Sequence, residues 1–229
     1  MADRPRGFPA RFPVRDDGKR PWRYRVVSFV SRVALRTLFG RRLQFQNMER
    51  FPLDGPLLVV TNHLSNVDPL LFGGFAPGTM FCMAKRELYS HRAVAWALAG
   101  CNCYPVDRGA GDRWALRTSL DILAKRGRLL IFLEGTRAKA PGMKRAEAGV
   151  GFLVRRSGAR VLPIAVWGTE RALARGRRLP RRVPVRVSIG EAYRPDVTTG
   201  GRPDEQAIAD GIARRVALLL PEEYRGVYA

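Results

Sequence analysis

The chain has few cysteines, few acidic residues and no long apolar stretch, and each shortage excludes a class of protein. Three cysteines among 229 residues cannot form a disulfide framework, which favours a reducing, cytosolic compartment. No run of about 18 apolar residues occurs, so the sequence predicts no transmembrane helix. The first apolar stretch is interrupted by Arg32 and is followed by no small-residue cleavage site, so no signal peptide is expected.

The shortage of acidic residues leaves a large excess of positive charge. Lys and Arg number 41 against 20 Asp and Glu, which gives a formal net charge of +21. Such a surface attracts nucleic acid, an anionic membrane leaflet or phosphorylated substrates. No common nucleic-acid-binding module is recognisable, so nucleic acid is not expected as a partner. An apolar fraction of 46% excludes a disordered chain, and the length suits one domain with a substantial core.

The N-terminal part differs in composition from the rest. Residues 1–21 are basic and rich in proline, and they are predicted to form a flexible arm. Residues 22–43 show a helical pattern with apolar residues on one broad face and arginines on the other. Two interpretations stay open: an amphipathic helix in a membrane surface, with Arg toward lipid phosphates, or an ordinary helix packed on the core. The predicted helix spans Trp22–Phe39, with Val26, Val27, Val30, Val33, Ala34 and Leu38 on the apolar face and Arg25, Arg32 and Arg36 opposite.

Residues 44–229 are predicted to form one α/β domain. Short apolar runs alternate with helical patterns, which is typical of a mixed, largely parallel central sheet flanked by helices. The arginine-rich stretch Arg171–Arg186 is a solvated loop or an anion-binding rim. The predicted strands are Leu57–Val60, Asn102–Val106, Leu129–Leu133, Val161–Trp167 and Val183–Ile189. The predicted helices are Pro69–Phe75, Arg92–Leu98, Asp112–Lys125, Arg145–Arg156 and Asp204–Leu220.

A histidine and an aspartate follow the predicted strand Leu57–Val60. His63 lies in the loop, and the pair Asp68-Pro69 predicts a helix that begins at Pro69 with Asp68 as its cap. If the loop folds back to the cap, the carboxylate can hold one imidazole nitrogen while the other nitrogen removes a proton. The alternative is a turn in which Asn, Ser and Asp side chains make only local hydrogen bonds.

Two further polar clusters follow strands. In Glu134–Arg137, the glycine permits a sharp turn, Arg137 could bind phosphate, and Glu134 could hold Arg137 or another cation. The cluster Val106–Gly109 contains Asp107 and Arg108. Either cluster alone could be a surface turn with a salt bridge. Because ligands of open α/β sheets bind beyond the carboxyl ends of the strands, these clusters and His63 could meet as a base beside a phosphate clamp.

Together these motifs resemble those of the glycerolipid acyltransferases, and among them the bacterial 1-acylglycerol-3-phosphate acyltransferases most. The segment His63 to Asp68 matches the His-x-x-x-x-Asp signature, and Glu134–Arg137 matches the Glu-Gly-Thr-Arg block. Val106–Gly109 is similar to the second block and Val161–Val166 to the fourth. The resemblance covers about residues 51 to 193. Departures from the family pattern are Leu133 in place of proline, Ala138 in place of serine, and Asp107 in the second block.

The resemblance implies a reaction. His63, oriented by Asp68, would deprotonate the sn-2 hydroxyl of lysophosphatidic acid, and the alkoxide would attack the thioester of acyl-CoA or acyl carrier protein. Phosphatidic acid would form, without a metal or other cofactor, at the cytoplasmic face of a membrane to whose anionic lipids the chain binds peripherally. The implied substrate-binding residues are Lys85, Arg108, Glu134, Gly135, Thr136 and Arg137, and Lys144 occupies a position where the family often has a lysine.

Other functions stay open. Relatives in the family acylate glycerol-3-phosphate, lysophospholipids, amino-acid lipids or glycolipids, so another acceptor is the main alternative. A basic nucleic-acid-binding protein is a second alternative. A lipid-binding scaffold without chemistry is a third, and the intact His63 and Asp68 argue against it.

Overall fold

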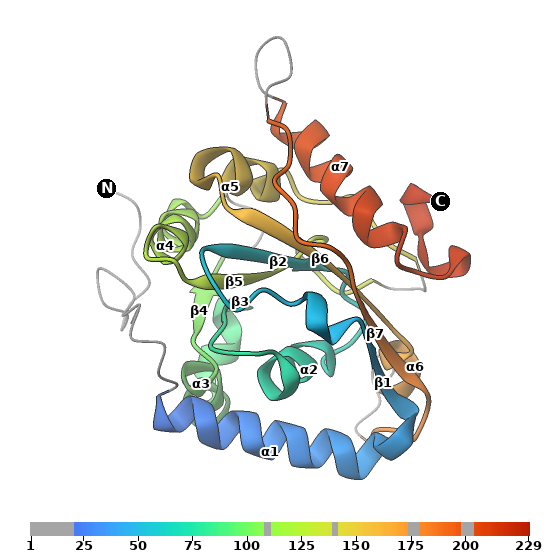
Figure 1. Ribbon diagram of the computed structural model, residues 1–229. Coiled ribbons are helices and arrows are strands. Elements are labelled where there is room, and N and C mark those ends of the chain that lie inside the picture. The colour runs from blue at the N-terminus through green and yellow to red at the C-terminus, as the bar shows by residue number, and fades with distance from the viewer. Residues whose placement is uncertain (1–20, 108–110, 139–141, 174–178, 198–203) are drawn as a thin grey trace.

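A seven-stranded sheet runs through the middle of the molecule, with strand order β1-β7-β6-β2-β5-β3-β4 (Figure 1). The computed structural model describes residues 21–107, 111–138, 142–173, 179–197 and 204–229. All neighbouring strands in the described residues are parallel except β6 and β7, which confirms the predicted mixed, largely parallel sheet. The strands are β1 Leu43–Gln46, β2 Leu57–Thr61, β3 Phe81–Lys85, β4 Cys103–Val106, β5 Arg128–Phe132, β6 Arg160–Trp167 and β7 Val185–Ile189.

Helices cover both faces of the sheet (Figure 1). Helices α4, α5 and α7 pack on one face, and α1 and α2 pack on the other, with α3 beside α1. The central strand β2 is buried along its whole length, as expected for a continuous apolar run in a parallel sheet covered on both faces. The helices are α1 Trp22–Phe39, α2 Asp68–Phe75, α3 Arg92–Gly100, α4 Arg113–Ala124, α5 Gly149–Ser157, α6 Thr169–Ala172 and α7 Glu205–Ala217.

Two strands were not predicted from the sequence. Strand β1 has four residues that alternate between half-buried and exposed at the edge of the sheet, and β3 is a short run that includes the polar Lys85. Neither forms the continuous apolar run that marks a central parallel strand. Their positions therefore depend on pairing with β7, β4 and β5 rather than on a local pattern.

The predicted helix Arg145–Arg156 begins four residues too early. Helix α5 begins at Gly149 because the preceding main chain bonds elsewhere. The N–H of Ala146 donates to the hydroxyl of Tyr228, and the N–H of Glu147 donates to the carbonyl of Leu133. These bonds attach the segment to the C-terminus and to the end of β5 instead of to a helical turn.

Helix α1 has the predicted bounds, but the face that packs is not the predicted apolar face of valines. Tyr24, Ser28, Ser31, Leu35 and Phe39 are buried. The two serines of α1 and Gly74 of α2 allow the helices to approach closely. A Cβ on Gly74 would lie only 3.2 Å from the main-chain nitrogen of Arg32.

The arginine stripe of α1 also differs from the prediction. Arg32 donates from Nε to the carbonyl of Gly74 at 2.9 Å, and the guanidinium of Arg36 lies 5.6 Å from the ring centre of Phe75. Arg32 is therefore tied to α2, whereas Arg36 packs beside Phe75 and is still exposed, so its contact with lipid phosphates stays a prediction. Large apolar side chains are left exposed instead, namely Trp22, Val26, Phe29, Val30 and Val33. Among the described helices, none is long and apolar enough to cross a bilayer.

Candidate active site

His63 and Asp68 meet at the carboxyl end of β2. The imidazole Nδ1 lies 2.8 Å from Asp68 Oδ2, and both side chains are buried. The same carboxylate oxygen accepts the N–H groups of Leu64 and Ser65 at 2.7 and 2.8 Å, so the loop wraps around it. Asp68 lies in the first turn of α2, with Val67 at the cap position that the sequence had assigned to Asp68. Its carboxylate thus serves the histidine loop rather than its own helix.

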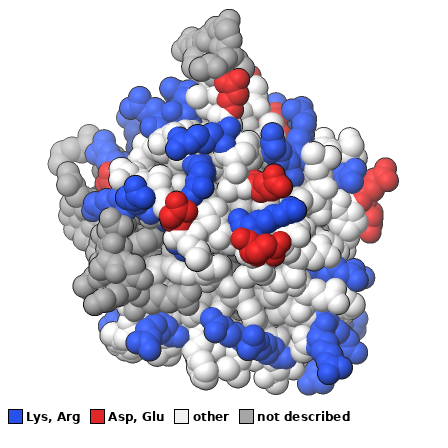
Figure 2. All heavy atoms as spheres, viewed as in Figure 1, with Lys and Arg blue, Asp and Glu red and all other residues white. Residues whose placement is uncertain are grey.

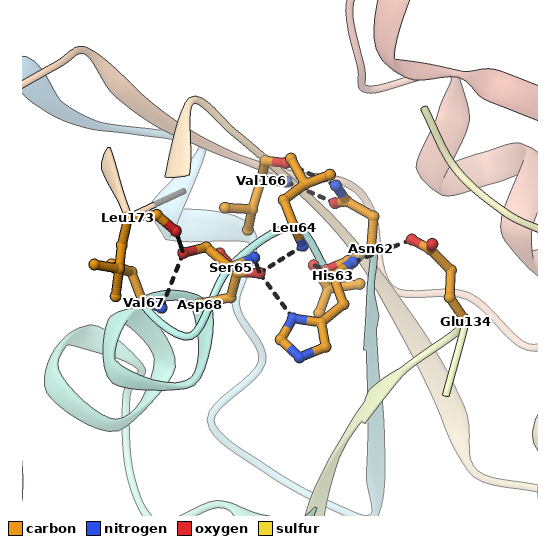
Figure 3. A network of polar contacts seen from close by, with 10 residues as sticks. Asn62, His63, Leu64, Ser65, Val67, Asp68, Glu134, Val166 and Leu173 are labelled. Carbon is orange, nitrogen blue, oxygen red and sulfur yellow. Dashed lines mark hydrogen bonds and ion pairs between the residues drawn. The ribbon is translucent and has the colours of Figure 1, made fainter. Parts of the chain in front are cut away.

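The geometry gives the two imidazole nitrogens different tasks. A carboxylate at Nδ1 holds the proton on that nitrogen and leaves Nε2 as the acceptor. Figure 3 shows the second nitrogen on the side of the ring away from Asp68. The ring of Phe132, at the end of β5, stacks on the imidazole with centroids 4.0 Å apart. The imidazole is therefore fixed on one side by a charge and on one face by an aromatic ring.

Asn62 fixes the main chain just before His63. Its amide nitrogen donates to the carbonyl of Val166 at 2.7 Å, and its amide oxygen accepts the N–H of Val166 at 2.9 Å (Figure 3). This side chain, which is 1% exposed, continues the pairing of β2 with β6 by one residue. The sequence suggested only local hydrogen bonds for an asparagine in this loop, whereas the partner of Asn62 lies 104 residues away.

Glu134 connects the histidine loop to the segment before α5. Its two carboxylate oxygens accept the N–H groups of His63 and Lys144, both at 3.2 Å. Glu134 therefore holds two main-chain segments, whereas the sequence suggested that it holds Arg137 or another cation. It is only 3% exposed, and burial raises its pKa to about 7. The hydrogen bonds from the two N–H groups lower the pKa but do not outweigh burial.

The segment after Glu134 lies against His63. Gly135 has φ of +62°, a left-handed conformation that favours glycine, and a Cβ there would come within 3.2 Å of the Glu147 side chain. The N–H of Ala138 donates to the carbonyl of His63 at 2.9 Å. The Lys144 ammonium donates to the hydroxyl of Thr136 and to the carbonyl of Arg137, at 3.3 and 3.2 Å. The motif Glu134–Arg137 and the catalytic candidates thus form one hydrogen-bonded unit.

The predicted phosphate-binding residues have different surroundings. Arg137 is half-buried, and its side chain makes no hydrogen bond to any described residue, which leaves the guanidinium available to a ligand. Lys85, at the end of β3, forms an ion pair with Glu87 at 2.8 Å and is 47% exposed. It is two strands from β2 and makes no contact with this unit among the described interactions. Arg108 lies outside the described residues.

A largely apolar cavity opens beside the site. It has a volume of about 490 Å³ and lies between α4, α5 and the ends of β3, β4 and β5. Strand β3 pairs with β5 only through Phe81 and Cys82, and the cavity lies where this pairing ends. Phe132 both lines the cavity and stacks on His63, so one aromatic ring connects the cavity to the imidazole. Other lining residues are Met83, Val106, Ala115, Leu116, Gly135, Thr136, Val150 and Leu153.

Comparison with known proteins identifies the family. A sequence profile described as Acyltransferase matches residues 42–167, which is more than half of the chain. The chain belongs to the acyltransferase family. The resemblance read from the motifs is thereby confirmed, and the matched range includes His63, Asp68 and Glu134. No group of three or more His, Cys, Asp or Glu that could hold a metal ion occurs in the described part of this acyltransferase.

Curated relatives are similar at low identity. The 1-acyl-sn-glycerol-3-phosphate acyltransferase of Streptococcus pneumoniae is 26% identical over 128 residues, covering 54% of this chain and 47% of that protein. The enzyme of the same name from Bacillus subtilis is 27% identical over 163 residues, 69% of this chain and 78% of that protein. The lyso-ornithine lipid O-acyltransferase of Pseudomonas aeruginosa is 30% identical over 112 residues, 48% and 43% of the two chains. The match thus spans about half the length of two of these relatives.

A solved structure shares the fold. The crystal structure of the 1-acyl-sn-glycerophosphate acyltransferase from Thermotoga maritima matches with a TM-score of 0.70. The match covers 86% of this chain and 79% of that one, at 24% sequence identity. This likeness supports the arrangement of strands and helices described above.

Proposed function

We propose that this acyltransferase moves a fatty acyl group from a thioester donor to the sn-2 hydroxyl of 1-acylglycerol-3-phosphate. The observation that carries the proposal is the contact of His63 Nδ1 with Asp68, which leaves Nε2 as a base on an imidazole that stacks on Phe132, a residue of the cavity wall. The Nε2 takes the hydroxyl proton, and the oxygen attacks the thioester carbonyl. The C–S bond then breaks, and the imidazolium returns the proton to the thiolate of acyl-CoA or acyl carrier protein.

Arg137 and the cavity are assigned to the two ends of the substrates. The Arg137 guanidinium, which has no partner among the described residues, offers a forked pair of donors to the acceptor phosphate. The Lys144 ammonium donates to the carbonyl of Arg137, and the Lys144 N–H donates to Glu134, so the two residues hold the main chain of Arg137. The cavity of about 490 Å³ falls within the size range of ligand sites and takes the acyl chain. Lys85 and Arg108 remain candidates for a longer-range contribution to the phosphate.

The exposed face of α1 is assigned to the membrane. Trp22 and Phe29 are 63% and 67% exposed, on a helix whose opposite face packs on α2. An apolar ridge with aromatic residues and flanking arginines is suited to the interface of an anionic bilayer. Residues 22–43 would thus hold the active-site edge at the leaflet that contains the lipid acceptor, as a peripheral protein at the cytoplasmic face.

A direct assay tests the proposal. Purified full-length protein is supplied with labelled acyl-CoA or acyl carrier protein and a panel of acceptors, and the expected product is phosphatidic acid. His63→Ala should abolish transfer, and the matched control His91→Ala, which changes the chain's other histidine, exposed at the start of α3, should retain it. Near-normal transfer by His63→Ala would exclude His63 as the base.

The similarity to a lyso-ornithine lipid acyltransferase favours one alternative acceptor. Lyso-ornithine lipid has no phosphate, so Arg137→Ala should raise KM for 1-acylglycerol-3-phosphate and leave KM for lyso-ornithine lipid unchanged. If transfer to lyso-ornithine lipid is faster in the unaltered protein, the acceptor assignment changes while the role of His63 stays.

A further inference from the structure

An open basic groove lies where α1 ends. It has a volume of about 360 Å³ and is lined by the last turn of α1, by Arg41 and Arg42 in the following 3-10 turn, and by Arg182 from the segment before β7. All three arginines are exposed, and none forms an ion pair or side-chain hydrogen bond with the described residues. Arg41 and Arg42 also suit the negative end of the α1 dipole. Arg182, which comes from a distant segment, has no such explanation.

The two segments that meet at the groove contain no carboxylate. Residues 21–48 include six arginines and residues 179–190 include three, and neither range contains Asp or Glu. Figure 2 agrees with this: along the lower edge of the view, over α1, Lys and Arg side chains alternate with uncharged atoms and no acidic side chain is seen. The positive charge of the groove is therefore not neutralised by its own segments, and it attracts an anion.

The groove lies at the same edge of the sheet as His63. Leu43, directly after Arg42, pairs with Val185 at the start of β7. The next residue of β7, Arg186, pairs with Trp167 at the end of β6, and β6 lies beside β2. The groove is thus three strands along the edge from the catalytic candidates, roughly 14 Å at about 4.8 Å per strand.

We propose that Arg41, Arg42 and Arg182 bind the phosphodiester of an anionic phospholipid headgroup in the bilayer. The apolar ridge of α1 ends at the groove, so entry of Phe29 and Val30 into the leaflet places the groove at headgroup depth. Guanidinium groups offer paired donors that match phosphate oxygens. The inference rests on the proposed membrane-facing site and adds a defined lipid contact. Bound there, the lipid turns the His63 edge of the sheet toward the leaflet.

Vesicle sedimentation of the full-length chain tests this contact. The triple variant Arg41→Gln, Arg42→Gln, Arg182→Gln is compared with a control that loses the same charge from the helices on the other face of the sheet: Arg117→Gln, Arg156→Gln, Arg214→Gln. Each basic residue at an anionic leaflet strengthens partitioning about fivefold, so the groove variant should bind vesicles containing phosphatidylglycerol about a hundredfold more weakly. The control should lose only a few-fold, because charges beyond a Debye length of about 8–10 Å are screened.

Three outcomes would overturn the proposal. Equal losses in the two variants would show that net charge alone is responsible. If the groove variant lost as much binding to phosphatidylcholine vesicles without phosphatidylglycerol as to vesicles that contain it, the anionic headgroup would be excluded as the ligand. Equal vesicle binding by the groove variant and the unaltered chain, with binding of inorganic phosphate in solution lost only in the groove variant, would assign the groove to a soluble phosphate compound. Thermal unfolding of each variant verifies its fold.

The test is separate from the proposed reaction. The assay contains no acyl donor, so its result is the same whether or not the protein transfers acyl groups. His63→Ala should bind the vesicles like the unaltered chain. A chain that binds through the groove but transfers nothing would contradict the proposed function alone.

Discussion

Replacing Glu134 with glutamine should change how stability depends on pH. In the folded chain burial raises the pKa of Glu134 to about 7, from an ordinary value of 4.5. The ionised form is therefore the less favourable one in the folded state. The protonated carboxyl of Glu134 therefore stabilises the folded chain relative to the unfolded chain. This contribution is complete below about pH 4.5 and is lost as the pH rises through 7. A shift of about 2.5 pH units at about 1.36 kcal/mol each amounts to about 3 kcal/mol.

The structure gives glutamine a defined effect. Glutamine resembles the protonated carboxyl, since it keeps one acceptor oxygen for the N–H of either His63 or Lys144 and turns a donor toward the other. It does not ionise. The free energy of unfolding of the unaltered chain minus that of Glu134→Gln should thus fall by about 3 kcal/mol between pH 4.5 and pH 8.

Urea unfolding at a series of pH values measures this difference. The matched control is Glu49→Gln, which changes an exposed glutamate with no hydrogen bond to the described residues. A difference that stays constant for Glu134→Gln, or that rises with pH, would refute the reasoning that burial outweighs the two N–H donors.

Three further predictions concern the site and the cavity. Asp68→Asn should keep the fold and lower kcat by about 10²–10⁴, because the amide cannot hold the proton on Nδ1; steady-state kinetics measure this, and unchanged kcat would contradict the assigned tautomer. Asn62→Ala should lower the free energy of unfolding by about 2–4 kcal/mol, since the N–H and the carbonyl of Val166 lose their partners. Urea unfolding measures this loss, and a loss below about 1 kcal/mol would contradict the prediction. Leu116→Trp should shift the preferred donor to shorter acyl chains by filling the cavity, whereas Leu120→Trp, one turn along α4, should not; equal preferences would place the acyl chain elsewhere.

Much of the architecture follows from local patterns. Buried parallel strands need continuous apolar runs, and the runs at Leu57 and Val161 therefore marked β2 and β6 within one residue. The spacing of His63 and Asp68 around a loop and a helix start allowed the side chains to meet, and the fold of the loop decided their contact at hydrogen-bond distance. Strand β1 and the start of α5 could not be read in this way, because long-range pairing and hydrogen bonds define them.

The sequence by itself determined the motifs that contain the candidate catalytic residues and the two-sided pattern of α1. Only the tertiary structure decided what these residues contact. Periodicity shows that a helix has two faces, but it cannot show which face packs. Here small side chains at Ser28, Ser31 and Gly74 let the face that also contains Leu35 and Phe39 pack, and the predicted apolar face is left largely exposed. In the same way, the roles of Asn62 and Glu134 and the grouping of Arg41 with Arg182 depend on partners far apart in the chain, which only folding brings together.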